Sequence, residues 1–112
     1  MSRRYLGEFE EIVLLTVAVL DGKGYGIAIK DDIEQRLARK VSVGAMRTAL
    51  KRLEGKGYLK SELGEPTAKR GGKRKRFFQV THAGREVLEQ VMDARKRLWQ
   101  AIPYTSIDFK FA

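Results

Sequence analysis

Hydrophobic residues recur with a helical period in four segments of the chain. A first helix is expected over about residues 7–20, because apolar side chains surround it nearly completely and acidic residues occupy its first turn. A second helix is expected over about residues 25–37, where Ile29, Ile33 and Leu37 share one face. The chain therefore begins with two helices, and the first should be buried on more than one side.

A third helix is expected over about residues 43–56, with Ser42 as its N-cap. Its inner face carries four apolar residues: Met46, Ala49, Leu50 and Leu53. At about 100° per residue, Gly44, Thr48 and Lys51 point the other way, with Arg47 on the flank. The outer face of this helix is therefore small, hydroxylic and basic.

Two strands are expected next. Residues 58–63 alternate, with Leu59 and Leu63 on one face, and residues 73–80 return with Phe78 and Val80 facing inward. The polar tip between them makes the pair a β-hairpin.

The last helix is expected over about residues 82–101, capped by Thr81 and stopped by Pro103. Its apolar stripe is too long for one small core to cover. We expect a homodimer, in which the stripe packs against a second copy and against the exposed side of the first helix. The residues expected at this interface are Phe9, Val13, Val87, Val91, Leu98 and Trp99.

Three helices, a hairpin and a closing helix predict a mainly α (α+β) fold, a winged helix-turn-helix with a C-terminal dimerisation helix. At 112 residues the chain is one compact unit. Within it we expect a DNA-binding domain over residues 1–81, the dimerisation helix over residues 82–102 and a tail over residues 103–112.

The amino-acid composition excludes several kinds of functional site. The chain has no Cys and one His, which excludes a disulfide scaffold and a thiolate zinc site and disfavours catalysis. We expect no enzyme, no metal and no cofactor. The apolar run from Ile12 to Leu20 is far shorter than the roughly 20 residues that cross a bilayer, so we expect no membrane partner and a cytoplasmic location.

The basic excess is concentrated in the middle of the chain. Residues 39–76 hold thirteen basic and three acidic residues, a net charge of +10, whereas the net charge of the whole chain is +9. Such a concentration is typical of nucleic-acid binders and predicts double-stranded DNA as the partner. A solvated basic surface and attraction to acidic membranes are the alternatives.

Short motifs follow one another in a characteristic order: Leu6-Gly7-Glu8-Phe9-Glu10, Tyr25-Gly26, Val41-Ser42-Val43-Gly44-Ala45, Leu63-Gly64-Glu65-Pro66-Thr67, Arg70-Gly71-Gly72-Lys73-Arg74 and Thr81-His82-Ala83-Gly84-Arg85. In their order and spacing the chain resembles the PadR family of bacterial transcriptional regulators over about residues 5–100. One departure is Met46-Arg47-Thr48-Ala49, where many members carry Leu-Tyr-Pro-Thr, so the operator sequence does not carry over.

The resemblance implies a dimeric winged-helix repressor. Its third helix would enter the major groove, its wing would touch the DNA backbone, and its last helix would cross the first helix of the partner. The recognition helix is expected over about residues 42–57 and the basic wing over residues 64–76. The expected DNA-contacting residues are Tyr25, Ser42, Gly44, Arg47, Thr48, Lys51, Lys69, Arg70, Lys73, Arg74 and Arg76.

Other interpretations remain beside this one. Two concern the single residues Tyr25 and Trp99, and one concerns the whole domain. Tyr25 is expected to pack into the core beside Ile29, with its hydroxyl or the adjacent amide on a phosphate. Trp99 is ordinary interface packing or the stacking platform of a small, planar hydrophobic effector at the dimer centre. The whole domain is either a DNA-binding regulator or a protein-interaction adaptor whose basic face meets an acidic partner.

Overall fold

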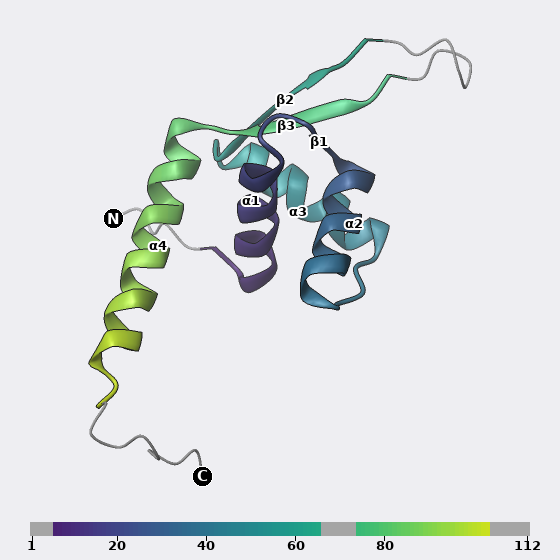
Figure 1. The fold of residues 1–112 in the computed structure, drawn as a ribbon. Coiled ribbons are helices and arrows are strands. Elements are labelled where there is room, and N and C mark those ends of the chain that lie inside the picture. Colours follow the sequence, from purple (N-terminus) through teal and green to yellow (C-terminus); the bar gives the residue numbers. More distant parts are fainter. Residues whose placement is uncertain (1–5, 66–73, 104–112) are drawn as a thin grey trace.

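The computed structural model of the chain describes residues 6–65 and 74–103 (Figure 1). It contains the four expected helices: α1 (Glu8–Leu20), α2 (Gly26–Leu37), α3 (Val43–Gly55) and α4 (His82–Ala101). The expected hairpin is also present, as β2 (Leu59–Leu63) and β3 (Arg76–Val80). Together they form the predicted winged helix-turn-helix, in which α1, α2 and α3 pack together and the hairpin projects past them.

One strand is absent from the sequence prediction. β1 (Gly24–Tyr25) pairs antiparallel with β3 and gives a three-stranded sheet in the order β1-β3-β2. Two residues are too short to display an alternating pattern, so periodicity cannot reveal this strand. β1 ties the start of α2 to β3, at Phe77 and Phe78.

The hydrophobic core lies between the three N-terminal helices and one face of the sheet. Leu14, Ile29, Ile33 and Leu53 are almost completely buried there, and Leu59 and Phe78 close it from the hairpin. These residues occupy the inner positions that the helical period indicated. The core therefore fixes which faces of α2 and α3 remain outside.

The predicted caps of α3 and α4 are formed. The Ser42 hydroxyl accepts a hydrogen bond from the Ala45 amide at 3.0 Å, and the Thr81 hydroxyl accepts one from the Gly84 amide at 3.1 Å. Thr81 also donates to the carbonyl oxygen of Gly57 at 2.6 Å. One side chain thus fixes the start of α4 and the end of the turn after α3.

Burial along the hairpin corrects one expectation. Leu59 is buried as predicted, but Leu63 on the same face is 45% exposed. The alternation indicated the correct face, but β2 runs outward from the body, so its far end has no core to face (Figure 1). Val80 is half-buried, whereas Phe78 is buried.

Helix α4 lies along α1 at its start and then leaves the body of the molecule (Figure 1). Val87 and Leu88 in its first half are buried. Farther along, Arg95 reaches back to α1 and forms two hydrogen bonds with the Glu11 carboxylate, at 3.0 and 2.8 Å. The second half of α4 exposes apolar side chains to solvent.

Candidate DNA-binding surface

The outer face of α3 is an exposed surface that carries two cations. Gly44, Arg47, Thr48 and Lys51 are all exposed on it, as the helical period predicted. In the described residues, neither Arg47 nor Lys51 has a hydrogen-bond or ion-pair partner within the chain. A Cβ added at Gly44 would meet open space. These groups are free to reach a ligand outside the protein.

A carboxylate holds the turn that leads into α3. One Glu34 oxygen accepts a hydrogen bond from the Val41 amide at 2.9 Å, and the other accepts one from Lys30 at 3.3 Å. The amide of Val41 and the ammonium of Lys30 hold the pKa of Glu34 below its ordinary value. Glu34 therefore fixes α3 relative to α2, which sets how the outer face of α3 is presented.

A second carboxylate ties the far end of α3 to α1. Burial would raise the pKa of Glu10, but hydrogen bonds from Lys56 at 2.8 Å and from the Gly7 amide at 3.2 Å outweigh it and lower the pKa. Glu10 is thus a charged group of α1 that holds the C-terminal end of α3 in place.

The far end of the hairpin strands adds cations to the same side of the molecule. Arg74, Lys75 and Arg76 are exposed there. Arg74 donates to the Gly64 carbonyl oxygen at 2.8 Å, and Arg76 donates to the Ser61 hydroxyl at 3.1 Å. The predicted contact residues Lys69, Arg70 and Lys73 lie outside the described residues.

Ser61 connects this hairpin to α3. Its hydroxyl donates to the Glu54 carboxylate of α3 at 2.7 Å while accepting from Arg76. The orientation of the hairpin is therefore linked to the orientation of α3.

The placement of Tyr25 corrects the sequence expectation. Its ring is half-buried and lies outside the core, edge-on to Phe77 with ring centroids 5.6 Å apart. The Lys75 ammonium lies 4.2 Å from the centroid of the Tyr25 ring, a cation–π contact. Pairing of β1 with β3 draws Tyr25 to the hairpin, away from Ile29.

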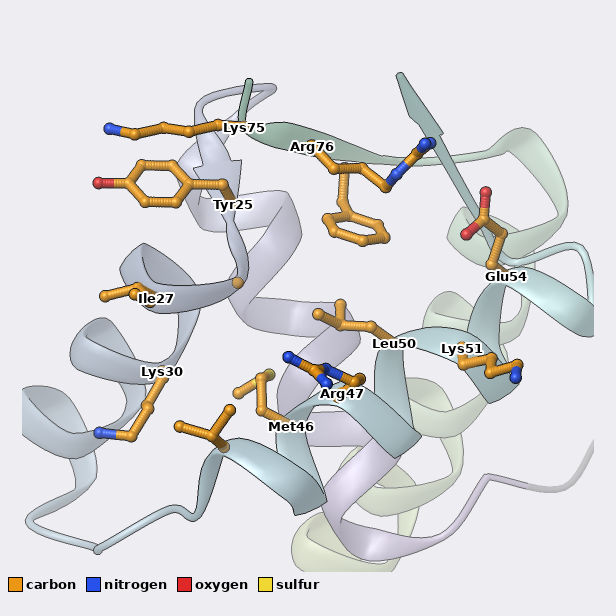
Figure 2. A pocket seen from close by; sticks show the side chains of 13 residues that line it. Tyr25, Ile27, Lys30, Met46, Arg47, Leu50, Lys51, Glu54, Lys75 and Arg76 are labelled. Atoms are coloured by element: carbon orange, nitrogen blue, oxygen red, sulfur yellow. The ribbon is translucent and has the colours of Figure 1, made fainter. Parts of the chain in front are cut away.

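Lys75 gains a specific place from this contact. The sequence indicates it only as one of several cations in the basic wing. In Figure 2 the Tyr25 and Lys75 side chains extend side by side in the same direction. In the sequence, only the run of cations pointed to Lys75. Its contact with Tyr25 depends on the short strand β1, which the sequence did not predict.

The predicted interface residues do not share one environment. Val13 and Val87 have no exposed surface, since the protomer's own core encloses them, so a second copy cannot contact them in this conformation. Phe9 and Val91 are half-buried, and the guanidinium of Arg39 lies 5.4 Å from the Phe9 ring centroid. Leu98 and Trp99 are 73% and 67% exposed.

Residues 6–65 and 74–103 contain no group of three or more His, Cys, Asp or Glu side chains that could hold a metal ion. None of the helices described is long and apolar enough to cross a membrane.

Comparison with known families gives one match over most of the chain. The model of the transcriptional regulator PadR-like family matches residues 14–90. An uncharacterised 37.1 kDa protein of a Streptomyces fradiae transposon is 37% identical over 86 residues, 77% of this chain and 23% of that protein. The chain thus spans about a quarter of the length of this relative.

Solved structures share the fold. A PadR-like transcription factor from Bacteroides fragilis superposes with a TM-score of 0.69 at 19% identity, over 88% of this chain and 89% of that one. A PadR family regulator from Eggerthella lenta gives 0.66 at 21% identity, over 92% and 88% of the two chains. One from Clostridium difficile gives 0.56 at 28% identity, over 88% and 96%.

Proposed function

We propose that this chain, which belongs to the PadR-like family of transcriptional regulators, acts as a homodimeric repressor that reads a specific DNA sequence with α3. Its family membership confirms the expectation of a DNA-binding transcriptional regulator and not an enzyme. Repression, dimerisation and the contacting residues are the parts that we propose. As a repressor it would work in the cytoplasm of a bacterial cell, where its operator is.

The open outer face of α3 is the observation that carries this proposal. Arg47 and Lys51 are exposed and unpaired within the described chain, whereas most carboxylates of α1 and α2 are engaged with cations. Arginine and lysine can bond the O6 and N7 acceptors of guanine, and Thr48 can contact a base edge or a thymine methyl group. Gly44 has no side chain, so the backbone of α3 can come close to the groove at this position.

The far end of the hairpin strands and the start of α2 would contact the sugar–phosphate backbone. Arg74, Lys75 and Arg76 supply charge there, and Tyr25 can offer its hydroxyl to a phosphate. Such contacts set position and affinity but carry little sequence information. Lys69, Arg70 and Lys73 extend the same role to the basic wing.

Dimerisation is proposed from the exposed half of α4. Leu98 and Trp99 lie on the stripe predicted from sequence, and an apolar surface of this kind is typical of an interaction site. Two copies would present two α3 helices to successive major grooves, which matches a two-fold symmetric operator.

A binding titration on the DNA upstream of the gene tests the proposal. Arg47→Ala should lower affinity for the preferred sequence by about tenfold and bring it closer to that for random DNA, because base contacts are worth about 1–3 kcal/mol. The double variant Arg74→Ala/Arg76→Ala should weaken both sequences alike and reduce the salt dependence.

Arg85→Ala is the matched control, since it removes an exposed arginine of α4 that pairs with Glu89 and lies away from α3. It should bind DNA as the wild type does. If the wild type prefers no upstream sequence over random DNA at low salt, sequence-specific repression is wrong.

A further inference from the structure

A pocket of about 470 Å³ opens on the same side of the molecule as the outer face of α3. The start of α2, the α3 helix and strand β3 form its walls (Figure 2). Its size falls in the range of small-molecule sites, roughly 300–1,000 Å³. It is separate from the dimer-facing end of α4, where the sequence suggested an effector.

The body of the pocket is apolar. Core residues Met46, Leu50 and Phe78, each less than a tenth exposed, reach its floor. Ile27 and Val43 form its walls and are 62% and 57% exposed. Single exposed apolar residues are common on protein surfaces. Here two of them continue an apolar floor, so the pocket offers one connected surface for an apolar group.

The rim of the pocket is cationic. Arg47, Lys51 and Lys75 border it, and none of the three pairs with a carboxylate in the described chain. In Figure 2 the Arg47 side chain projects beside Met46 and Leu50, toward the middle of the pocket. Glu54 is the one carboxylate among the lining residues, and it already accepts a hydrogen bond from Ser61. The rim therefore favours an anionic group on the ligand.

We propose that this pocket binds a hydrophobic anion, a molecule with an apolar body and one acidic group, and that the bound anion excludes DNA. The apolar body would cover Ile27 and Val43, and the acidic group would pair with Arg47 or Lys51. Exclusion of DNA rests on the proposed function, because these same two cations are the proposed contacts with the major groove. By linkage, DNA weakens the ligand by the same factor as the ligand weakens DNA.

The probe for the site is 1-anilinonaphthalene-8-sulfonate, whose fluorescence rises in apolar surroundings. N-phenyl-1-naphthylamine has the same aromatic body without the sulfonate and is the matched neutral ligand. We expect the sulfonate to bind about tenfold more tightly than the neutral amine, since charge-assisted hydrogen bonds are the stronger ones. Equal affinities would overturn the anionic class of ligand.

Ile27→Glu and Val43→Glu test the location of the site. Both positions lie in the first turn of a helix, where an acidic side chain favours the helix dipole, so both variants should fold. Each places a like charge in the wall of the pocket and should weaken the sulfonate by about tenfold or more. Leu37→Glu is the control, because Leu37 is 50% exposed on α2 but does not line the pocket.

If both pocket variants still bind the sulfonate as tightly as the wild type, the sulfonate occupies another surface, such as the exposed end of α4. That result would overturn the assignment of the ligand to this pocket. A final titration measures DNA affinity with the sulfonate at saturation, where we expect a loss of about tenfold or more. Unchanged DNA affinity under those conditions overturns the exclusion. Failure of the probe to bind a protein that still binds DNA overturns the pocket and leaves the proposed function intact.

Discussion

Gly84 and Gly44 are glycines near the starts of two helices, but their surroundings are opposite. A Cβ added at Gly84 would collide with the carbonyl oxygen of Tyr58 and lie 2.9 Å from Cγ1 of Val80, whereas one added at Gly44 would meet nothing within 4 Å. Gly84 is therefore required for the close approach of α4 to Tyr58, in the turn between α3 and β2. Gly44 is required by nothing inside the protein.

Gly84→Ala should destabilise the fold by about 1–3 kcal/mol, the usual cost of forcing extra atoms into a packed site. Gly44→Ala should leave stability unchanged or raise it by up to about 1 kcal/mol, because alanine favours a helix over glycine. Urea unfolding of the two variants and the wild type measures both. An unaffected Gly84→Ala variant would show that α4 can shift away from Tyr58 at little cost.

Glu34 decides the geometry of the turn between α2 and α3. Its pKa lies below the ordinary value in the folded protein because the Val41 amide and Lys30 bond its charged form. A folded pKa below the unfolded one adds stability that is present at neutral pH and is lost as the pH falls through the folded pKa. The turn should therefore loosen in acid.

Glu34→Gln should be less stable than the wild type at pH 7, and the difference should shrink as the pH is lowered below about 4, near the ordinary pKa of Glu. Chemical unfolding at several pH values measures this. Glu62→Gln serves as the control, since Glu62 is exposed on β2 and has no partner in the described chain. A stability difference that stays constant from pH 7 to pH 3 would contradict a role for the charged form.

At the scale of elements, sequence reasoning succeeded where the signal was local. The bounds of α3 and α4 follow from the apolar period together with Ser42 and Thr81, whose caps need only neighbouring residues. The outer face of α3 follows from the same period, because positions opposite Met46 and Leu53 must point outward.

Sequence reasoning failed where a feature depends on distant segments. The two residues of β1 carry no periodic signal, and without β1 the cation–π contact between Tyr25 and Lys75 cannot be foreseen. The pocket beside α3 was not predicted either, because its walls come from three elements that are separate in the sequence, α2, α3 and β3. Ile27 and Val43 show no periodic signal that distinguishes pocket walls from ordinary exposed residues.

The ion pair between Arg95 and Glu11 links the second half of α4 to α1, and we expect it to hold this part of α4 in place. Glu11 is largely buried on α1, and Arg95 in the exposed half of α4 donates a hydrogen bond to each of its carboxylate oxygens. Arg97 on the same helix pairs with Asp93 one turn away and makes no such link to α1.

Arg95→Ala should speed amide hydrogen exchange in α4 after about residue 90 while leaving exchange in α1–α3 nearly unchanged. Arg97→Ala, which removes the same charge, should have little effect, because an exposed i,i+4 pair contributes little. Hydrogen-exchange mass spectrometry compares the two variants. Equal exchange in both would mean that Glu11 does not hold α4 in place.

At the scale of the whole molecule, the charged side chains divide into those paired within the chain and those left unpaired. Five of the six carboxylates of α1 and α2 form ion pairs within the chain: Glu8 with Arg39, Glu10 with Lys56, Glu11 with Arg95, Asp32 with Arg36 and Glu34 with Lys30. Arg47, Lys51 and Lys75 are left without such partners. In the described part of the chain, Arg47 and Lys51 on α3 and Lys75 beside β3 are thus exposed cations that a polyanion can meet.

The proposed dimer depends on the other exposed feature, the apolar end of α4. Leu98→Asp or Trp99→Asp would place a charge in the interface of both copies, so each substitution acts twice in a symmetric dimer. We expect the dimer dissociation constant to rise by about 100-fold or more, because burying each of these side chains is worth about 1.5–3 kcal/mol. The fold of the protomer should persist, since both side chains are exposed in it.

Sedimentation velocity over a range of protein concentrations measures this change, with Leu37→Asp on α2 as the control of similar exposure. The control should sediment as the wild type does. A monomer would contact one half-site at a time, so the α4 variants should also lose affinity for a two-fold operator while keeping affinity for a single half-site. Equal loss on both DNAs would mean that α4 supports α3 within one protomer, and a wild type that sediments as a monomer at tens of micromolar would contradict the dimer itself.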